Sequence, residues 1–174
     1  MKKIIFGFFT LTAFFIACTA KKEEAKTSST ASSVKLPYEA MYTTDFTNNV
    51  SDSDLLMVMN SYKYWETGDL AALRTTMGDS MSVDGSDGFK FNGLTDSLMK
   101  TWQISRDSMS SIVIKMDVWL KNHSVKDSMD YINVWYKEID TYKTGRVDSA
   151  NYSDVNGLKN GKVIWFSSYK QKLK

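Results

Sequence analysis

The second half of the chain alternates apolar and polar residues in the manner of β-strands, and this pattern restricts the fold more than any other feature. Between residues 112 and 120 every second position is apolar, namely Ile112, Ile114, Met116, Val118 and Leu120. Residues 131–142 and 161–169 are rich in β-branched and aromatic side chains, and residues 147–158 form a weaker run. A period of two is typical of strands, and residues 159–161, Lys-Asn-Gly, carry a strong hairpin signal. We therefore predict an antiparallel meander over these segments, with the 112–120 run facing a single side.

The part of the chain before this meander carries helical patterns instead. Residues 51–54 fit a capping box, and the apolar side chains that follow recur at helical spacing: Leu55, Val58, Met59, Tyr62 and Trp65. Gly68 ends this helix, Asp69 caps a short second one, and Thr95 or Asp96 opens a third. Between the second and third helices, a small hairpin turns through residues 84–88. This order predicts an α+β domain with three N-terminal helices packed on a curved, mainly antiparallel sheet.

The N-terminal segment has the pattern of an export signal. Lys2 and Lys3 precede the apolar residues 4–16, a run shorter than the roughly 20 residues that a membrane-spanning helix needs. Phe15, Ile16, Ala17 and Cys18 resemble the lipobox of bacterial lipoproteins, and Cys18 is the only cysteine of the chain. The resemblance implies that residues 1–17 are a signal peptide and that Cys18 is acylated. An ordinary secretory signal with an incidental cysteine is the alternative.

The segment after this motif predicts a flexible spacer and a cellular location. Residues 18–37 contain almost no large apolar side chains, so we expect a flexible tether that carries the acylated cysteine. Thr19 directly after Cys18 favours, by the same resemblance, sorting to the outer membrane. Residues 38–174 are expected to form one domain, and the predicted location is the cell envelope, as an outer-membrane lipoprotein.

Composition excludes several classes of protein. The chain has 22 Lys and Arg residues against 20 Asp and Glu, and it is neutral once Lys2 and Lys3 are removed with the signal. A neutral chain lacks the basic surface that nucleic-acid binding needs. One Cys and one His exclude a disulfide framework and a zinc site of Cys and His ligands. The acidic turn at residues 84–88 lacks the spacing of a calcium-binding EF-hand, so we expect neither a metal nor a cofactor.

Three local motifs resemble the nuclear transport factor 2-like superfamily, also called SnoaL-like or cystatin-like cone folds. Residues 62–70 are similar to its helix–Gly-Asp–helix opening, residues 77–83 with Gly88 to its first hairpin, and residues 160–169 to its closing hairpin. The resemblance implies a cone whose open end is an apolar pocket, used by binders for ligands and by isomerases and cyclases for acid–base chemistry. It also implies that relatives dimerise through the outer face of the sheet.

Candidate residues follow for each use of such a pocket. Large side chains on the expected buried faces either fill the core or line a cavity for a flat apolar ligand, and they are Tyr62, Trp65, Trp102, Met116, Trp135 and Trp165. Trp119, out of phase with the 112–120 run, is expected to share an exposed apolar patch with Val113, and this patch is the candidate surface for a homodimer.

Ionisable residues give weaker candidates. Asp117 lies one position out of phase with its strand, so we expect it to point away from the pocket unless a bulge intervenes. Glu138 and Asp140 share a face of their strand and are expected at a solvated end of the sheet. His123 is expected to be an exposed turn residue.

These observations predict a lipid-anchored envelope protein with a pocket-containing domain. We expect it to bind a small apolar ligand without chemistry, or to act as an interaction module through its sheet. The alternative is an enzyme of the isomerase, dehydratase or hydrolase type on a small apolar substrate, with Asp117 or Glu138 as its base.

Overall fold

The computed structural model describes residues 37–38 and 40–173, and residues Ala40–Lys174 form one compact unit. The predicted signal peptide, Cys18 and most of the predicted tether lie outside the described residues. No helix in the described part of the chain is long and apolar enough to cross a membrane.

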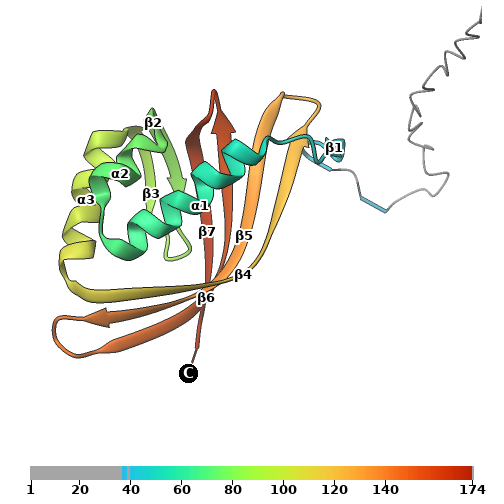
Figure 1. Ribbon diagram of the computed structural model, residues 1–174. Coiled ribbons are helices and arrows are strands. Elements are labelled where there is room, and N and C mark those ends of the chain that lie inside the picture. The colour runs from blue at the N-terminus through green and yellow to red at the C-terminus, as the bar shows by residue number, and fades with distance from the viewer. Residues whose placement is uncertain (1–36, 39, 174) are drawn as a thin grey trace, which may run out of the picture. The chain divides into compact units, whose positions relative to one another are not determined.

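The described residues form helices on one side of a seven-stranded sheet (Figure 1). Along the chain the elements are β1 (Phe46–Thr47), α1 (Asp52–Thr67), α2 (Leu70–Thr75), β2 (Met77–Asp84), β3 (Lys90–Leu94), α3 (Thr95–Asp107), β4 (Met109–Ser124), β5 (Met129–Tyr142), β6 (Val147–Lys159) and β7 (Lys162–Lys172). The strand order is β1-β4-β5-β6-β7-β2-β3, antiparallel except for the β2–β7 pair. The long strands bend around the helices, which confirms the predicted α+β class and the curved sheet.

The helix boundaries follow from local chemistry that is legible in the sequence. Ser51 caps α1 by accepting a hydrogen bond from the Asp54 amide at 3.0 Å. Gly68 ends α1 in the left-handed conformation, with φ of 78°. Asp69 then accepts from the Ala72 amide at 2.9 Å and starts α2. At the end of α1, the Arg106 guanidinium donates to the carbonyl oxygens of Trp65 and Glu66, so α3 is tied to the last turn of α1.

A bulge at Asp117 divides β4 into two parts of opposite phase. Met116 is paired with Tyr136, but the next paired residue, Val118, faces Trp135. Since paired residues share a face and neighbours alternate, Ile112, Ile114 and Met116 lie on the helix side, whereas Val118 and Leu120 lie on the outer side. The prediction that the whole run shares a single face is therefore wrong beyond Met116. Val118 and Leu120 are 48% and 52% exposed.

The same bulge moves Trp119 to the helix side of the sheet. Trp119 is paired with Val134, which is fully buried under the helices, and the next inward residue, Lys121, makes an ion pair of 2.8 Å with Asp52 at the start of α1. Val113 is paired with Ile139 on the outer side. Trp119 and Val113 thus lie on opposite faces, and the expected patch containing both is wrong.

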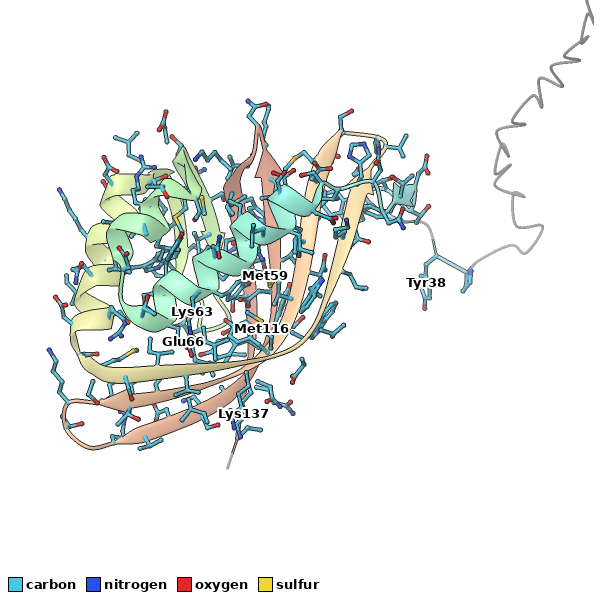
Figure 2. The ribbon with its side chains drawn as sticks, in the orientation of Figure 1. Tyr38, Met59, Lys63, Glu66, Met116 and Lys137 are labelled. Atoms are coloured by element: carbon cyan, nitrogen blue, oxygen red, sulfur yellow. The ribbon has the colours of Figure 1, made fainter. Side chains whose placement is uncertain are left out.

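The core lies between the helices and the inner face of the sheet. Its fully buried members come from every layer and include Val58 of α1, Leu98 of α3, Met81 of β2, and Ile132 and Val134 of β5. Glu66 on α1 also accepts a hydrogen bond from the Ile114 amide of β4 at 3.1 Å. Lys63 pairs with the same carboxylate at 2.6 Å (Figure 2). Side-chain contacts of this kind attach α1 to an edge of the sheet.

Candidate functional site

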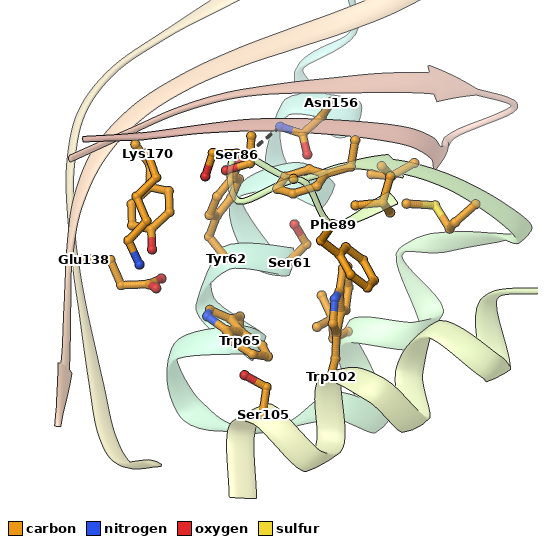
Figure 3. Close-up of a pocket in the computed structure, with 18 of the residues that line it drawn as sticks. Ser61, Tyr62, Trp65, Ser86, Phe89, Trp102, Ser105, Glu138, Asn156 and Lys170 are labelled. Carbon is orange, nitrogen blue, oxygen red and sulfur yellow. Dashed lines mark hydrogen bonds between the residues drawn. The ribbon is translucent and has the colours of Figure 1, made fainter. Parts of the chain in front are cut away.

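A cavity of about 390 Å³ opens between the helices and the curved sheet (Figure 3). Its walls come from α1, α3, the β2–β3 hairpin and the inner faces of β5, β6 and β7. Seven of the lining residues are aromatic, and the rings belong to Tyr62, Trp65, Phe89, Trp102, Tyr136, Tyr152 and Phe166. A cavity of this size and lining accommodates a small, mainly apolar molecule.

Three of the pocket residues named from the sequence line this cavity. Tyr62 and Trp65 face it from α1, because they continue the buried stripe of that helix. Trp102 faces it from α3, and its ring lies 6.3 Å from that of Trp65 in an edge-to-face arrangement. Two helices that are adjacent through the Arg106 contacts therefore supply one aromatic wall.

The other three, Met116, Trp135 and Trp165, are not among the lining residues. Met116 faces inward but packs against the core. Trp135 shares the outer face with Val118, one position out of phase with the buried Val134 and Tyr136. Trp165 is paired with Gly157, and its ring lies 6.3 Å from that of Tyr131. A strand aromatic can face either side, and strand phase decides which.

Asp117 is exposed at the bulge and does not line the cavity, so it cannot contact a ligand held there. Glu138 does line it and is only 7% exposed. Asp140, two residues along the same face, is 5% exposed. The expectation that these two carboxyls lie at a solvated sheet end is wrong, because α3 and the bent strands cover this end of β5.

The environment of Glu138 keeps its carboxyl protonated near neutral pH. Burial raises its pKa to about 8, and the negative charges of Asp140 and Asp154 act in the same direction. Burial also raises the pKa of Asp140. The charge of Lys170 partly opposes both shifts. A neutral Glu138 offers the cavity a proton donor rather than a base, which changes the role expected for it in the enzymatic alternative.

Asp154 is fully buried behind the aromatic wall, and it accepts hydrogen bonds from tyrosine hydroxyl groups of that wall. The hydroxyls of Tyr62 and Tyr136 both donate to its Oδ2, at 3.0 and 2.9 Å. Asn156 donates to the Tyr62 oxygen at 3.1 Å, shown as a dashed line in Figure 3. Burial raises the pKa of Asp154 to about 6, although hydrogen bonds from Ser168 and the two tyrosines oppose the shift.

Sequence reasoning missed Asp154, Asn156, Tyr136 and Tyr152 as site residues. The signal was their phase: Tyr152, Asp154 and Asn156 alternate with Ser153 and Val155, and register places all three on the inner face. Hydrophobicity did not reveal it, because this inward-facing row is mainly polar. Strand pairing stacks Tyr152 on Tyr136, with ring centroids 5.1 Å apart and planes 9° apart.

Two further candidates from the sequence, His123 and the acidic turn at residues 84–88, lie apart from the buried carboxyls described above. His123 belongs to β4 and not to a turn, and its Nδ1 lies 2.6 Å from Asp130 Oδ1 in a half-buried pair outside the cavity. The acidic turn supplies Gly85, Ser86 and Asp87 to the rim of the cavity. Among residues 37–38 and 40–173, no group of three or more His, Cys, Asp or Glu side chains is placed to hold a metal ion.

Comparison with solved structures identifies the fold. An LEH-like epoxide hydrolase of M. tuberculosis matches with a TM-score of 0.59 and 8% identity, over 70% of this chain and 84% of that one. A ketosteroid isomerase-like protein of Erwinia carotovora atroseptica matches with a TM-score of 0.57 and 14% identity, over 71% and 98%. An NTF2-like protein of unknown function from Burkholderia pseudomallei matches with a TM-score of 0.54 and 16% identity, over 70% and 92%.

Sequence comparison adds no assignment, since no family model and no curated protein matches the chain. At identities of 8–16% the structural matches bear on architecture alone. They agree with the resemblance drawn from the three sequence motifs and with the helices packed inside a bent sheet. The chain therefore has the α+β cone fold of the nuclear transport factor 2-like proteins.

Proposed function

We propose that this domain binds a small, mainly apolar molecule in the cavity and performs no chemistry on it. The observation that carries the proposal is the cavity itself: about 390 Å³, walled by aromatic rings, with one buried carboxyl that is neutral near pH 7. Rings supply most of the contact area that a small apolar ligand buries. The neutral Glu138 carboxyl can orient such a ligand by a hydrogen bond without supplying a base.

Native mass spectrometry of the detergent-extracted full chain tests this proposal. We expect a small molecule to co-purify with the protein and to be lost in Trp102→Ala, which opens one aromatic wall. Trp135→Ala is the matched control, because it removes the same side chain from the outer face. Equal retention or equal loss in the two variants, or no bound molecule in any form, would contradict binding in the cavity.

We also propose that the protein is an outer-membrane lipoprotein of the cell envelope, anchored through an acylated Cys18. Support comes from the lipobox-like residues 15–18 and from the absence of any other cysteine in the sequence. Two or three acyl chains suffice for stable anchoring. Intact mass of the membrane-extracted protein should show a chain that begins at Cys18 and carries acyl mass. A soluble product with a free thiol would contradict the anchor.

A second candidate function is hydrolysis of a small apolar epoxide. The protonated Glu138 in the cavity favours it, together with the fold shared with an LEH-like epoxide hydrolase. Glu138 would donate its proton to the ring oxygen as water attacks a ring carbon, and the proton released by that water would restore the carboxyl. Diol formation from styrene oxide by the full chain, abolished in Glu138→Gln, would favour the enzyme. No turnover by the wild type would favour the binder.

A further inference from the structure

Four polar side chains of the cavity wall donate all their polar hydrogens in hydrogen bonds to other groups of the protein. The Ser61 hydroxyl donates to the Val58 carbonyl at 2.7 Å, and the hydroxyls of Tyr62 and Tyr136 donate to Asp154. Both N–H groups of Asn156 are used, one on the Tyr62 oxygen and one on the Ile132 carbonyl, each at 3.1 Å. These four groups can therefore present only oxygen lone pairs to a molecule in the cavity.

Three buried carboxyl groups also lie on this side of the sheet. Glu138, Asp140 and Asp154 are 7%, 5% and 0% exposed and lie on the inner faces of β5 and β6. Oδ1 of Asp140 is buried without a hydrogen-bond partner. Arg106, which lies close enough to influence Asp140, is engaged by the carbonyl oxygens of α1. Of these three carboxyl groups only Glu138 lines the cavity, so Glu138 is the carboxyl that a donor in the cavity can reach.

The protein's own Lys170 shows which kind of donor fits. Its ammonium nitrogen lies 5.2 Å from the centre of the Tyr152 ring, and the side chain reaches from β7 toward the Glu138 carboxyl (Figure 3). Lys170 and Glu138 both line the cavity. A cation over an aromatic face beside a carboxyl is a favourable arrangement. Lys170 itself is exposed at the rim, so it leaves the interior of the cavity without a cation.

We propose that the ligand of this cavity is an organic amine, whose ammonium group binds at Glu138 while its apolar part lies among the rings of Trp65, Trp102 and Phe89. An ammonium has three donors and no acceptor, which matches the oxygen lone pairs that the four side chains named above present. The aromatic lining adds favourable contact with the cation. This inference rests on the proposed binding function and specifies the ligand class.

Amine binding must release a proton near neutral pH. The groups that act on Glu138 are Asp140 on its own strand, Asp154 on β6 and Lys170 on β7. The hydroxyls of Tyr62, Tyr136 and Tyr152 in the same wall stay neutral, because burial raises the pKa of each. An ammonium beside Glu138 lowers the pKa of that carboxyl from about 8, so the proton it held leaves on binding.

Two probes of equal size test the proposal: phenethylamine, which is an ammonium at pH 7, and 2-phenylethanol, which is neutral. Binding to the detergent-solubilised full chain is measured by titration calorimetry. We expect phenethylamine to bind about tenfold more tightly than the alcohol. The apparent binding heat should also differ between phosphate and Tris buffers, because the released proton is taken up by the buffer.

Two variants localise the effect. Glu138→Gln should remove the preference for the amine while leaving the weaker binding of the alcohol, and circular dichroism would verify that it is folded. Asp117→Asn is the matched control, because it removes one carboxylate outside the cavity, and it should keep the preference. Lys170→Met removes the competing ammonium of the protein and should tighten amine binding about threefold.

The outcomes separate this inference from the proposed function. Equal affinities, a preference for the alcohol, or a preference that survives Glu138→Gln would overturn the amine inference and leave cavity binding standing. If neither probe binds while an unrelated small molecule co-purifies in the cavity, the amine inference is again wrong and the proposed function is retained. If neither probe binds and nothing co-purifies, both are wrong.

Discussion

The two faces of β5 differ in a way that hydrophobicity alone does not anticipate. The inner face carries Tyr136, Glu138 and Asp140, all buried, whereas the outer face carries Trp135, Lys137 and Ile139, all partly exposed. The more polar face is the covered one. Apolar side chains there would make a more stable core, so packing alone does not account for the polar inner face.

Removal of the acceptor behind the inner wall gives the largest expected effect on stability. Asp154→Ala leaves the buried hydroxyls of Tyr62 and Tyr136 without their acceptor, and each unsatisfied buried donor costs free energy. We expect a loss of about 3 kcal/mol in the free energy of unfolding by chemical denaturation. Ser153→Ala, the adjacent position on the outer face, should change it by less than about 0.5 kcal/mol. Equal losses in the two variants would remove the distinction between the faces.

The sequence predicted the architecture well because its signals are local. Ser51, Gly68 and Asp69 determine helix ends by contacts within a few residues, and the hairpin at Asn160 and Gly161 forms where the Asn-Gly pair predicts it. The fold class, the order of elements and the aromatic wall from α1 and α3 were therefore accessible without coordinates.

The part of the site that lies on the sheet was much harder to predict from the sequence. Strand phase across β5–β7 depends on pairing between distant segments and on the register shift at Asp117, neither of which has a local signature in the chain. For this reason Trp135 and Trp165 were assigned to the wrong face, and Glu138 was expected in solvent. Asp154 was missed, because only its partners Tyr62 and Tyr136, 92 and 18 residues away, give it a role.

The buried carboxyls of the inner face predict a pH dependence that exposed carboxylates would not give. The pKa of Glu138 is raised to about 8 and that of Asp154 to about 6 in the folded protein, so the folded state binds more protons than the unfolded state below those values. Stability is then greatest at acidic pH and falls as pH rises through the folded pKa values. Between pH 6 and pH 9 we expect a loss of about 1–2 kcal/mol.

Glu138→Gln should flatten this dependence above pH 6, and Asp117→Asn should leave it unchanged, since Asp117 is exposed. Denaturant midpoints measured at pH 6, 7, 8 and 9 provide the comparison. A wild-type protein that gains stability over this range would show that Glu138 is ionised in the folded state.

The outer face gives the smallest effect on stability and the clearest effect on assembly. Val113, Val118, Leu120 and Tyr169 are 42%, 48%, 52% and 67% exposed, and the pairing of the strands places them on one side of the sheet. We expect this face to join two copies of the chain, because exposed apolar side chains that share one face are covered in an interface. Val118→Asp would place a charge in that interface without touching the core, so sedimentation of the detergent-solubilised chain should change from dimer to monomer. The free energy of unfolding of the separated monomer should stay within about 0.5 kcal/mol of that of the wild-type chain.

Lys137→Ser, also on the outer face but polar, is the matched substitution that should leave the dimer intact. A wild-type chain that sediments as a monomer would leave the outer face as simple solvent-facing surface, and the contrast between the faces would then rest on the cavity wall alone.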